Sequence, residues 1–385
     1  MSRHITTEEL IHFIRSTFHE PKEFIPLHAP HFGGKEKEYV LNTIESTFVS
    51  SVGAYVDRFE EMMREITGAK YAVATVNGTT ALHLALLMAG VKRDEIVITQ
   101  SLTFVATANS IAHAGAIPAF VDVDLDTMGM SPDALGDFLK TNAELKGDYA
   151  ILKSTGQKIA AILPMHTFGL PLRIERIVEI ANQYKIPVVE DAAESIGSYI
   201  ENTHTGNFGL IGTFSFNGNK TVTCGGGGAL ITNDERIGKH AKYVSTTAKK
   251  PHPYLFFHDE VGYNYRMPNL NAALACAQLE QLDEILKAKR ILAEIYMKFF
   301  ENSDLIYKKE REHTRANYWL NAIQVPDLGT REHFLKELNA AGVMSRPIWT
   351  LMTKLPMYQN CEHGSLTHAS WLEDRIINLP SSVRK

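Results

Sequence analysis

One lysine in the sequence stands where its amine could do covalent chemistry. Lys220 follows an Asn-Gly turn at 217–218, and an apolar run at 212–216 that is typical of a strand leads into that turn. Four glycines at 225–228 come next and allow the backbone to pack tightly beside whatever the lysine holds. A lysine amine held in this way can bond to a carbonyl carbon and later move protons as a free base. The alternative is an ordinary solvated lysine.

Two other segments place polar groups at the ends of predicted strands. Residues 77–80 read Asn-Gly-Thr-Thr and lie between a strand and an apolar helix. Free backbone N–H groups, the helix dipole and threonine hydroxyls could bind a phosphate there. Asp191 ends a β-branched run that begins at Ile186, which is typical of a buried strand. Simple helix capping is the alternative for both segments.

These segments recur with others in an order that resembles one known enzyme family. The similar stretches begin near Ile25 and continue to the C-terminus. They include Tyr-Ala-Val-Ala-Thr-Val-Asn-Gly-Thr at 71–79, Thr-Phe-Val-Ala-Thr-Ala-Asn at 103–109, Glu-Asp-Ala-Ala-Glu-Ser at 190–195, Phe-Ser-Phe-Asn-Gly-Asn-Lys at 214–220 and Gly-Tyr-Asn-Tyr-Arg-Met at 262–267. Their order and spacing resemble the pyridoxal-phosphate (PLP) sugar aminotransferases of the DegT/DnrJ/EryC1/StrS family.

The resemblance implies a PLP fold type I architecture and a PLP cofactor bound as a Schiff base on Lys220. Asp191 matches the family position whose carboxylate keeps the ring nitrogen of the cofactor protonated. Lys220 and Asp191 are therefore the predicted catalytic residues.

Further cofactor contacts follow from the same resemblance. Gly78, Thr79 and Ser215 match positions around the phosphate, and Phe104 matches the aromatic residue that stacks on the ring. Asn264 matches a residue that reaches the phosphate from a neighbouring subunit, which implies a homodimer with shared active sites.

Glu194 matches a position near the phenolic oxygen of the cofactor. A second carboxylate beside a phenolate is unfavourable unless it is protonated or turned toward another partner. Whether Glu194 contacts the cofactor stays open at this point.

Four polar residues are candidates for substrate contacts. His166 follows a predicted strand at the mouth of the sheet, and Arg266, Tyr318 and Arg346 resemble positions near the sugar nucleotide. Arginines suit a diphosphate, and ordinary structural roles are the alternative for each of the four. The family motif at Arg346 often continues Pro-His, whereas Pro-Ile-Trp follows here, so no histidine contact is expected there.

The resemblance implies a transaminase that moves an amino group from L-glutamate to C4 of a nucleotide-linked ketosugar. The pattern is most similar to enzymes acting on UDP-linked 4-keto-6-deoxy-N-acetylhexosamines, of the kind that lead to legionaminic acid or bacillosamine in bacterial surface glycans. A TDP- or GDP-linked ketosugar is the alternative acceptor.

Three other classes of protein agree less well with the sequence. A related PLP sugar 3-dehydratase would carry histidine in place of Lys220, and a non-catalytic regulatory relative would be expected to lose Lys220 or Asp191. A nicotinamide oxidoreductase requires Gly-x-Gly-x-x-Gly at the start of a helix, which residues 77–79 do not supply.

Composition is that of an ordinary globular protein. The 385 residues carry a net charge of -5, which argues against a nucleic-acid surface. The 16 histidines and 3 cysteines form no metal-binding motif, and the odd cysteine count fits a reduced compartment. Without a membrane span or signal peptide in the pattern, the expected location is the cytoplasm.

Strands and helices alternate between residue 71 and about residue 232, which predicts βαβ units and a mainly parallel, seven-stranded sheet in an α/β fold. Ligands of such sheets gather beyond the carboxyl ends of the strands, where Gly78, Asp191 and Lys220 fall. The expected strands are 71–76, 95–99, 116–123, 159–163, 186–189, 212–216 and 229–232, and expected helices include 80–89, 104–113 and 172–184.

The ends of the chain form separate units in this prediction. A capping box, Thr-Thr-Glu-Glu at 6–9, opens an amphipathic helix, and a long helical pattern at 269–300 leads into a smaller C-terminal α+β domain. The predicted units are an N-terminal helical extension (1–25), a large PLP-binding domain (26–255) and the small domain (256–385). The aromatic residues of a loop at 249–257 could be exposed or could plug the space between domains.

Overall fold

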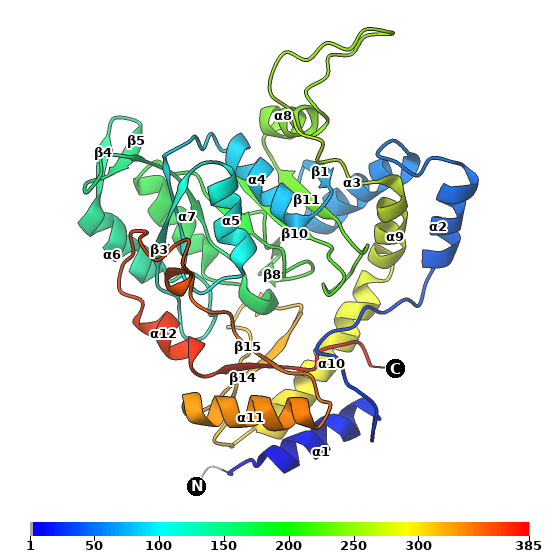
Figure 1. Cartoon of the computed structure of the whole chain (residues 1–385), viewed down its shortest axis with the longest axis vertical. Helices are drawn as coiled ribbons and strands as arrows, with labels where there is room; N and C mark the ends of the chain where they lie inside the picture. Colours follow the sequence, from blue (N-terminus) through cyan, green and yellow to red (C-terminus); the bar gives the residue numbers. More distant parts are fainter. Residues whose placement is uncertain (1–2, 385) are drawn as a thin grey trace.

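The computed structural model describes residues 3–384, and within them seven strands form the central sheet of a larger unit (Figure 1). Two sheets, ordered β1-β11-β10-β7 and β3-β2-β6-β5-β4, meet where single parallel bridges join Ile162 to Val188 and Met165 to Asp191. The seven strands are β1 (Tyr71–Thr75), β2 (Ile96–Gln100), β3 (Ile117–Val121), β6 (Lys158–Leu163), β7 (Val189–Asp191), β10 (Ile211–Ser215) and β11 (Gly228–Thr232).

Most of these strands are parallel, as predicted for the α/β fold. β2 pairs in parallel with β3 and β6, and β10 pairs in parallel with β7. Only β11 runs antiparallel to its neighbours within the central sheet, pairing with β1 and β10. A hairpin of β4 (Ala143–Lys146) and β5 (Tyr149–Leu152) extends the edge of β6.

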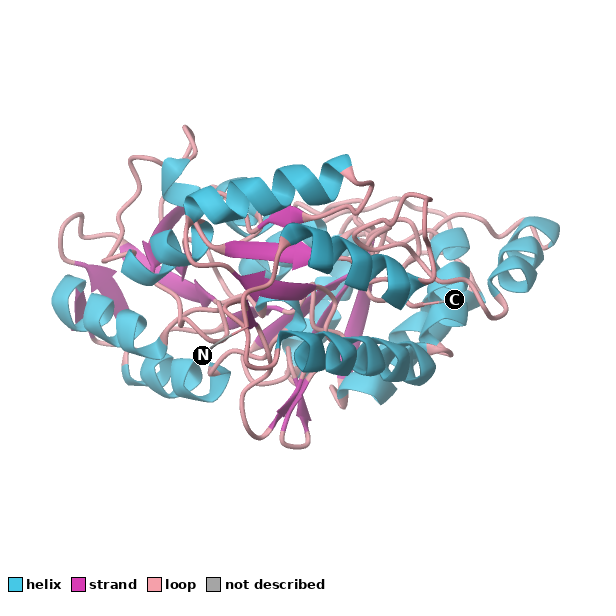
Figure 2. Cartoon of the chain, turned by 90° about the horizontal axis from the view of Figure 1, so that it is seen from below, coloured by secondary structure: helices cyan, strands magenta, loops and turns pink. Residues whose placement is uncertain are grey.

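Helices cover both faces of the central sheet (Figure 2). Alternate residues of one strand supply the two faces: Val73 lies in a core beneath α4 and α8, whereas Ala72 and Ala74 lie in the core beneath α3 and α9, as the two-residue period of a strand requires. The helices of this unit are α2 (Glu36–Glu45), α3 (Ala54–Thr67), α4 (Gly78–Met88), α5 (Val105–His113), α6 (Pro132–Asn142), η1 (Thr167–Gly169), α7 (Ile174–Gln183), α8 (Glu235–Ser245) and α9 (Asn269–Leu279).

The C-terminal residues form a smaller antiparallel sheet in the order β12-β14-β16-β15. Its strands are β12 (Ile306–Tyr307), β14 (Asn321–Gln324), β15 (Arg346–Pro347) and β16 (Ile376–Leu379), and its helices are α10 (Leu282–Phe300), α11 (Leu328–Ala340), η2 (Met352–Lys354) and α12 (Thr367–Glu373). A third, short sheet pairs β13 (Thr314–Arg315) with β8 (Tyr199–Ile200) and β9 (Thr203–His204).

The N-terminal helix belongs to the core of this smaller unit. The predicted capping box is present: Thr6 and Glu9 cap each other at the start of α1 (Thr7–Phe18). The buried face of α1 places Leu10 and Ile14 in one cluster with Tyr296 of α10 and Leu338 of α11. The helix therefore packs on the body of its own chain, beside α11 (Figure 1).

The predicted long helix at 269–300 is two helices, which corrects that expectation. α9 ends at Leu279 and α10 begins at Leu282. α9 is buried on nearly every side against α2 and α3, whereas α10 buries a stripe that reaches the small-sheet core. The break lets each half face a different core, which a single straight helix could not do.

The loop after α8 stands clear of the body (Figure 1). It folds back on itself through a bridge between Lys249 and His258, and its tip is apolar: Tyr254 and Phe256 are each 80% exposed and Phe257 is 61% exposed. These aromatic side chains are therefore exposed in this chain and do not plug the space between domains.

No helix between residues 3 and 384 combines the length and apolarity that crossing a membrane requires. Over the same residues, no group of three or more His, Cys, Asp and Glu side chains is placed to hold a metal ion.

Candidate active site

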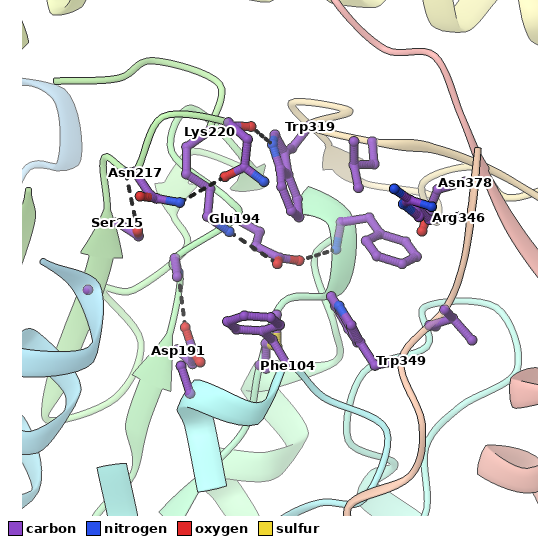
Figure 3. A pocket seen from close by; sticks show the side chains of 18 of the residues that line it. Phe104, Asp191, Glu194, Ser215, Asn217, Lys220, Trp319, Arg346, Trp349 and Asn378 are labelled. Carbon is purple, nitrogen blue, oxygen red and sulfur yellow. Dashed lines mark hydrogen bonds and ion pairs between the residues drawn. The ribbon is translucent and has the colours of Figure 1, made fainter. Parts of the chain in front are cut away.

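A cavity of about 640 Å³ lies between the carboxyl ends of the central strands and the small sheet (Figure 3). The large unit contributes side chains from the ends of β7 and β10 and the start of α4, and the small unit contributes β15, β16 and the segment before β14. Eight of the predicted site residues line it: Gly78, Thr79, Phe104, Asp191, Glu194, Ser215, Lys220 and Arg346.

Asp191 is buried at the end of β7 with its carboxylate held in one orientation. Thr107 of α5 donates a hydrogen bond to Oδ2 (2.8 Å) and the Ala193 N–H donates to Oδ1 (3.1 Å). Burial raises the pKa of Asp191 above the usual value of an aspartic acid, and its hydrogen bonds and the nearby Lys220 charge oppose that rise. A cationic N–H brought into the cavity at this point would gain a fixed, poorly hydrated anionic partner.

The start of α4 offers unused hydrogen-bond donors to the cavity. Asn77 caps the helix by accepting from the Thr80 N–H at 2.8 Å. The N–H groups of Gly78 and Thr79 have no protein partner within residues 3–384. A helix N-terminus with free N–H groups attracts anions, so this corner fits a phosphate.

Gly78 is required by the close approach of α4 to β10. A Cβ atom at Gly78 would lie 2.7 Å from Cβ of Ser215, a separation that side chains do not tolerate. The glycine therefore allows the Ser215 hydroxyl to lie beside the free N–H groups of the helix.

Lys220 extends into the middle of the cavity (Figure 3). Its Nζ lies 3.2 Å from Oε1 of Glu194 and 3.8 Å from the centre of the Trp319 ring. A carboxylate and an aromatic face both attract an ammonium group. The amine is thereby held in place, with 12% of the lysine side chain exposed.

Glu194 is buried beside Lys220 and is fixed by the backbone. Its Oε2 accepts a hydrogen bond from the Phe168 N–H at 2.8 Å. Burial raises the pKa of Glu194 to about 7, against the lowering effect of the Lys220 charge. The carboxyl group is therefore turned toward Lys220 and the Phe168 backbone, and it titrates near neutral pH.

We expect Glu194→Gln to stabilise the cofactor-free protein more at pH 8 than at pH 5. A carboxyl whose pKa rises on folding stabilises the fold fully below its ordinary value of 4.5, and that contribution is lost as the pH rises through about 7. The amide does not titrate, so the stability of the variant relative to wild type should grow by about 1–3 kcal/mol between these pH values. Urea unfolding at both pH values measures it.

Glu284→Gln is the matched control for that experiment, because Glu284 is exposed on α10 and forms no side-chain hydrogen bond or ion pair in the described part of the chain. Its stability difference from wild type should not change with pH. A Glu194→Gln difference that is equally flat would contradict the raised pKa of Glu194.

Aromatic rings form one wall of the cavity. Phe104 stands at the start of α5 and is 47% exposed. Its ring centre lies 6.2 Å from that of Trp349, which in turn lies 5.0 Å from that of Phe168. Figure 3 shows Phe104 and Trp349 on the side of the cavity opposite Lys220, where a planar ligand would contact the Phe104 ring.

His166, a predicted substrate contact, lies outside the cavity lining. It is fully buried, with Nε2 3.0 Å from Glu190 Oε2, and Nδ1 accepts from the Leu172 N–H. Because Nδ1 accepts, the proton is on Nε2 and is donated to Glu190. Glu190 also accepts from three backbone N–H groups at 206–209, so it ties the loop between β9 and β10 to β7.

Tyr318, another predicted substrate contact, also points away from the cavity. It is 1% exposed, and its hydroxyl accepts a hydrogen bond from the Glu310 N–H. Its backbone has a φ of 48°, in the left-handed region that an extended chain does not use. This turn brings the next residue, Trp319, over Lys220 instead.

Asn264 and Arg266 are also absent from the cavity of their own chain. Asn264 is exposed, and within the described residues its Oδ1 accepts only a long hydrogen bond, from Arg266 Nε at 3.4 Å. Both residues lie at the base of the protruding loop, where Asn264 forms an antiparallel bridge with Thr246.

Sequence reasoning missed several lining residues, including Trp319, Trp349, Asn217 and Asn378. Trp349 stands in the Arg-Pro-Ile-Trp segment, where the departure from the Pro-His pattern was the available signal. Asn378 had no signal, because it follows two isoleucines in an ordinary strand.

The residues of the cavity fit PLP. The start of α4 with Ser215 matches its phosphate, Phe104 can contact its ring, Asp191 can pair with a protonated ring nitrogen, and the Lys220 amine can reach a carbonyl carbon in the cavity. Four different requirements of one molecule are thus met from separate elements.

Comparison with known proteins agrees with this assignment. Residues 30–384 match the family model described as the DegT/DnrJ/EryC1/StrS aminotransferase family. GDP-perosamine synthase of Escherichia coli O157:H7 is 37% identical over 93% of each chain, and GDP-perosamine synthase of Vibrio cholerae is 34% identical over 93% of this chain and 94% of its own. The crystal structure of a DegT DnrJ EryC1 StrS aminotransferase from Brucella abortus has a TM-score of 0.83, 27% identity and 90% coverage of each chain.

Proposed function

The chain belongs to the DegT/DnrJ/EryC1/StrS aminotransferase family, and we propose that it moves an amino group from L-glutamate to C4 of a nucleotide-linked 4-keto-6-deoxysugar. The protein is a PLP-dependent sugar aminotransferase. The observation that best supports the proposal is the convergence of Lys220, Asp191 and the free N–H groups of α4 on one cavity.

When bound, PLP supplies an aldehyde that takes up the amino group and a ring that withdraws electrons from the reacting carbon. Gly78, Thr79 and Ser215 would bind its phosphate, and the Phe104 ring would contact its face. Asp191 would hold a proton on the ring nitrogen, because an ionised carboxylate in a buried site stabilises the adjacent N–H⁺.

Lys220 would carry protons to and from the reacting carbon and oxygen atoms of the substrate. Its amine is confined between Glu194 and the face of Trp319, so it stays within reach of a ligand in the cavity when it is not bonded to one. Confinement of a proton carrier in this way raises its effective concentration at the reacting atoms.

The nucleotide of the acceptor has two candidates. The sequence motifs resemble the branch acting on UDP-linked 4-keto-6-deoxy-N-acetylhexosamines. The relatives named GDP-perosamine synthase, which are 33–37% identical to this chain, favour a GDP-linked ketosugar instead. We expect the nucleotide to bind outside the residues that hold PLP, so the cofactor site does not distinguish the two.

A turnover screen tests this proposal. The holoenzyme is given L-glutamate and UDP-, GDP- or TDP-linked 4-keto-6-deoxysugars, and the 4-amino product is measured by mass spectrometry. A kcat/KM that is highest by at least about tenfold for one nucleotide assigns the acceptor, because nucleotide binding energy should raise rate as well as affinity. Turnover of none of them, with L-glutamate unable to donate, would contradict the proposed function.

We also propose a homodimer with shared active sites. Asn264 is exposed and is not among the residues that line the cavity of its own chain, and it lies at the base of the loop whose apolar tip includes Tyr254, Phe256 and Phe257. Exposed aromatic side chains gathered in one place are typical of an interface. A partner chain would cover them and receive Asn264 at its phosphate site.

Mixing two inactive variants should restore activity if the sites are shared. Lys220→Ala and Asn264→Ala chains, unfolded and refolded together, should form heterodimers in which one site has both residues intact. We expect up to about one quarter of wild-type activity, because half of the dimers are mixed and each has one complete site.

The control is each variant refolded alone, and Asn264→Ala alone must be impaired for the mixture to be informative. Light scattering gives the oligomeric state. A fully active monomer, or a mixture no more active than its components, would contradict the shared site.

A further inference from the structure

Arg346 and Asn378 face the active-site cavity together from the small sheet. They are direct partners in the antiparallel pairing of β15 and β16, so their side chains project from the same face of the sheet at neighbouring positions. Both line the cavity, and Figure 3 shows them on the far side from Asp191 and Ser215.

The Asn378 side chain is buried without a partner. The residue is 3% exposed, and its amide nitrogen has no hydrogen-bond partner within residues 3–384. Other buried amides differ: Asn317 donates to the carbonyls of Glu194 and Ile196, and Asn321 donates to the Ser381 hydroxyl. An unpaired buried amide destabilises the fold unless a ligand in the cavity accepts its hydrogen bond.

The Arg346 guanidinium is equally unused. It forms no hydrogen bond or ion pair with any residue from 3 to 384, and its side chain is exposed toward the cavity. Arg173 and Arg311, in contrast, each bind a carboxylate directly. The planar guanidinium therefore has a free fork of N–H donors beside the free amide.

We propose that Arg346 and Asn378 form the subsite that binds a carboxylate of the amino donor. A guanidinium fork matches the two oxygens of a carboxylate in one plane, and the neighbouring amide can donate a third hydrogen bond. Asn378 is buried, and a hydrogen bond from a buried donor to an anion is stronger than one made in open water.

The position of Asn378 favours a carboxylate over the diphosphate of the acceptor. At 3% exposure, the amide can contact only a group that enters the cavity completely. A diphosphate joined to a nucleotide must continue outward to the cavity mouth. The proposal rests on the proposed function, since it takes L-glutamate as the donor, and it adds the residues that recognise this donor.

Equilibrium binding of an unreactive dicarboxylate tests the subsite without turnover. Glutarate and its neutral diamide, glutaramide, are titrated into the PLP-loaded enzyme in a calorimeter. We expect the wild type to bind glutarate and to bind glutaramide at least about tenfold more weakly, because the amide groups carry no charge for Arg346. Equal binding of the two ligands would overturn the proposal.

Substitutions then locate the binding energy. Arg346→Met and Asn378→Leu should each weaken glutarate binding about 10- to 100-fold, the range for loss of hydrogen bonds to a charged group. Arg346→Lys should fall between wild type and Arg346→Met, because it keeps the charge and loses the fork. Arg236→Met is the control, since Arg236 is exposed on α8 and lies outside the cavity, and it should bind glutarate normally.

The diphosphate of the nucleotide sugar is the other anion that Arg346 could bind, and steady-state kinetics distinguish it from the donor carboxylate. In the Arg346→Met enzyme we expect the KM for L-glutamate to rise at least about tenfold while the KM for the nucleotide sugar changes less than about threefold. The reverse pattern would assign the pair to the diphosphate and overturn the proposal. Arg346 lies on an edge strand with an exposed side chain, so its variants test the subsite even if Asn378→Leu unfolds.

Failure of the inference and failure of the proposed function give different results. If wild-type enzyme does not take an amino group from L-glutamate, the proposed function fails. If it does, and the Arg346 and Asn378 variants bind glutarate as tightly as wild type, only the inference about the subsite fails.

Discussion

Replacing Lys220 with alanine is expected to remove measurable transamination. The Nζ of Lys220 is the amine held in the centre of the cavity by Glu194 and Trp319, and alanine removes both the covalent anchor of the cofactor and the proton carrier. General acid–base groups alone contribute about 10²- to 10⁴-fold to rate, so kcat should fall at least that far. Product formation measured over hours checks this.

The same variant should keep its fold and much of its affinity for PLP, because the groups that would bind the phosphate are unchanged. The N–H groups of Gly78 and Thr79 and the Ser215 hydroxyl do not depend on Lys220. The wild-type protein should be yellow, and borohydride should bleach its visible absorbance and fix the cofactor to the chain. The variant should bind PLP that washes out. Lys92→Ala is the control, since Lys92 is exposed and forms no side-chain hydrogen bond among residues 3–384. Normal turnover by Lys220→Ala would end the assignment.

Several of the residues predicted correctly as cavity lining follow from local sequence. Lys220 follows a strand and a turn, Gly78 begins a helix after a strand, and Asp191 ends a strand. Because the carboxyl ends of neighbouring parallel strands share one edge of a sheet, these short-range patterns also predict that the residues converge. The structure adds the reason for the glycine itself, since a Cβ atom at Gly78 would lie 2.7 Å from Cβ of Ser215.

The residues that were misplaced or missed depend on contacts distant in sequence. Because the backbone of Tyr318 is left-handed, Trp319 and not Tyr318 lines the cavity. Nothing in the sequence of the segment requires that turn. Asn378 enters the cavity only because β16 pairs with β15 in one register, and a shift of one residue would have placed Ile377 there. His166 lies outside the cavity because its side chain pairs with Glu190 of the neighbouring strand β7.

The sequence also did not predict the environment of the aromatic loop. The pattern at 249–257 predicts a loop with apolar side chains, and both a buried plug and an exposed tip satisfy it. The structure of one chain leaves Tyr254 and Phe256 exposed. Burial of apolar area drives association, so the proposed dimer would account for a composition that the single chain does not explain.

Asp191→Asn is expected to lower kcat about 10²-fold or more while the fold is retained. The amide has the shape of the carboxylate, and its oxygen can still accept from the Ala193 N–H. The Thr107 hydroxyl, which donates to Asp191 and lies 2.8 Å from Thr103 Oγ1, can turn to accept from the new amide. What is lost is the negative charge that holds a proton on the ring nitrogen of PLP, and loss of one such electrostatic partner costs on this scale.

The pH dependence separates this charge effect from a simple loss of packing. Without the carboxylate, the pKa of the ring nitrogen falls, so the protonated fraction in the variant rises as the pH is lowered. The ratio of wild-type to variant kcat should therefore shrink as the pH is lowered from 8 to 6. Asp137→Asn, an exposed carboxylate-to-amide change on α6, should leave kcat unchanged at every pH. A constant ratio for Asp191→Asn would mean that the carboxylate only supports the structure, and a near-wild-type rate would mean that another group serves the nitrogen.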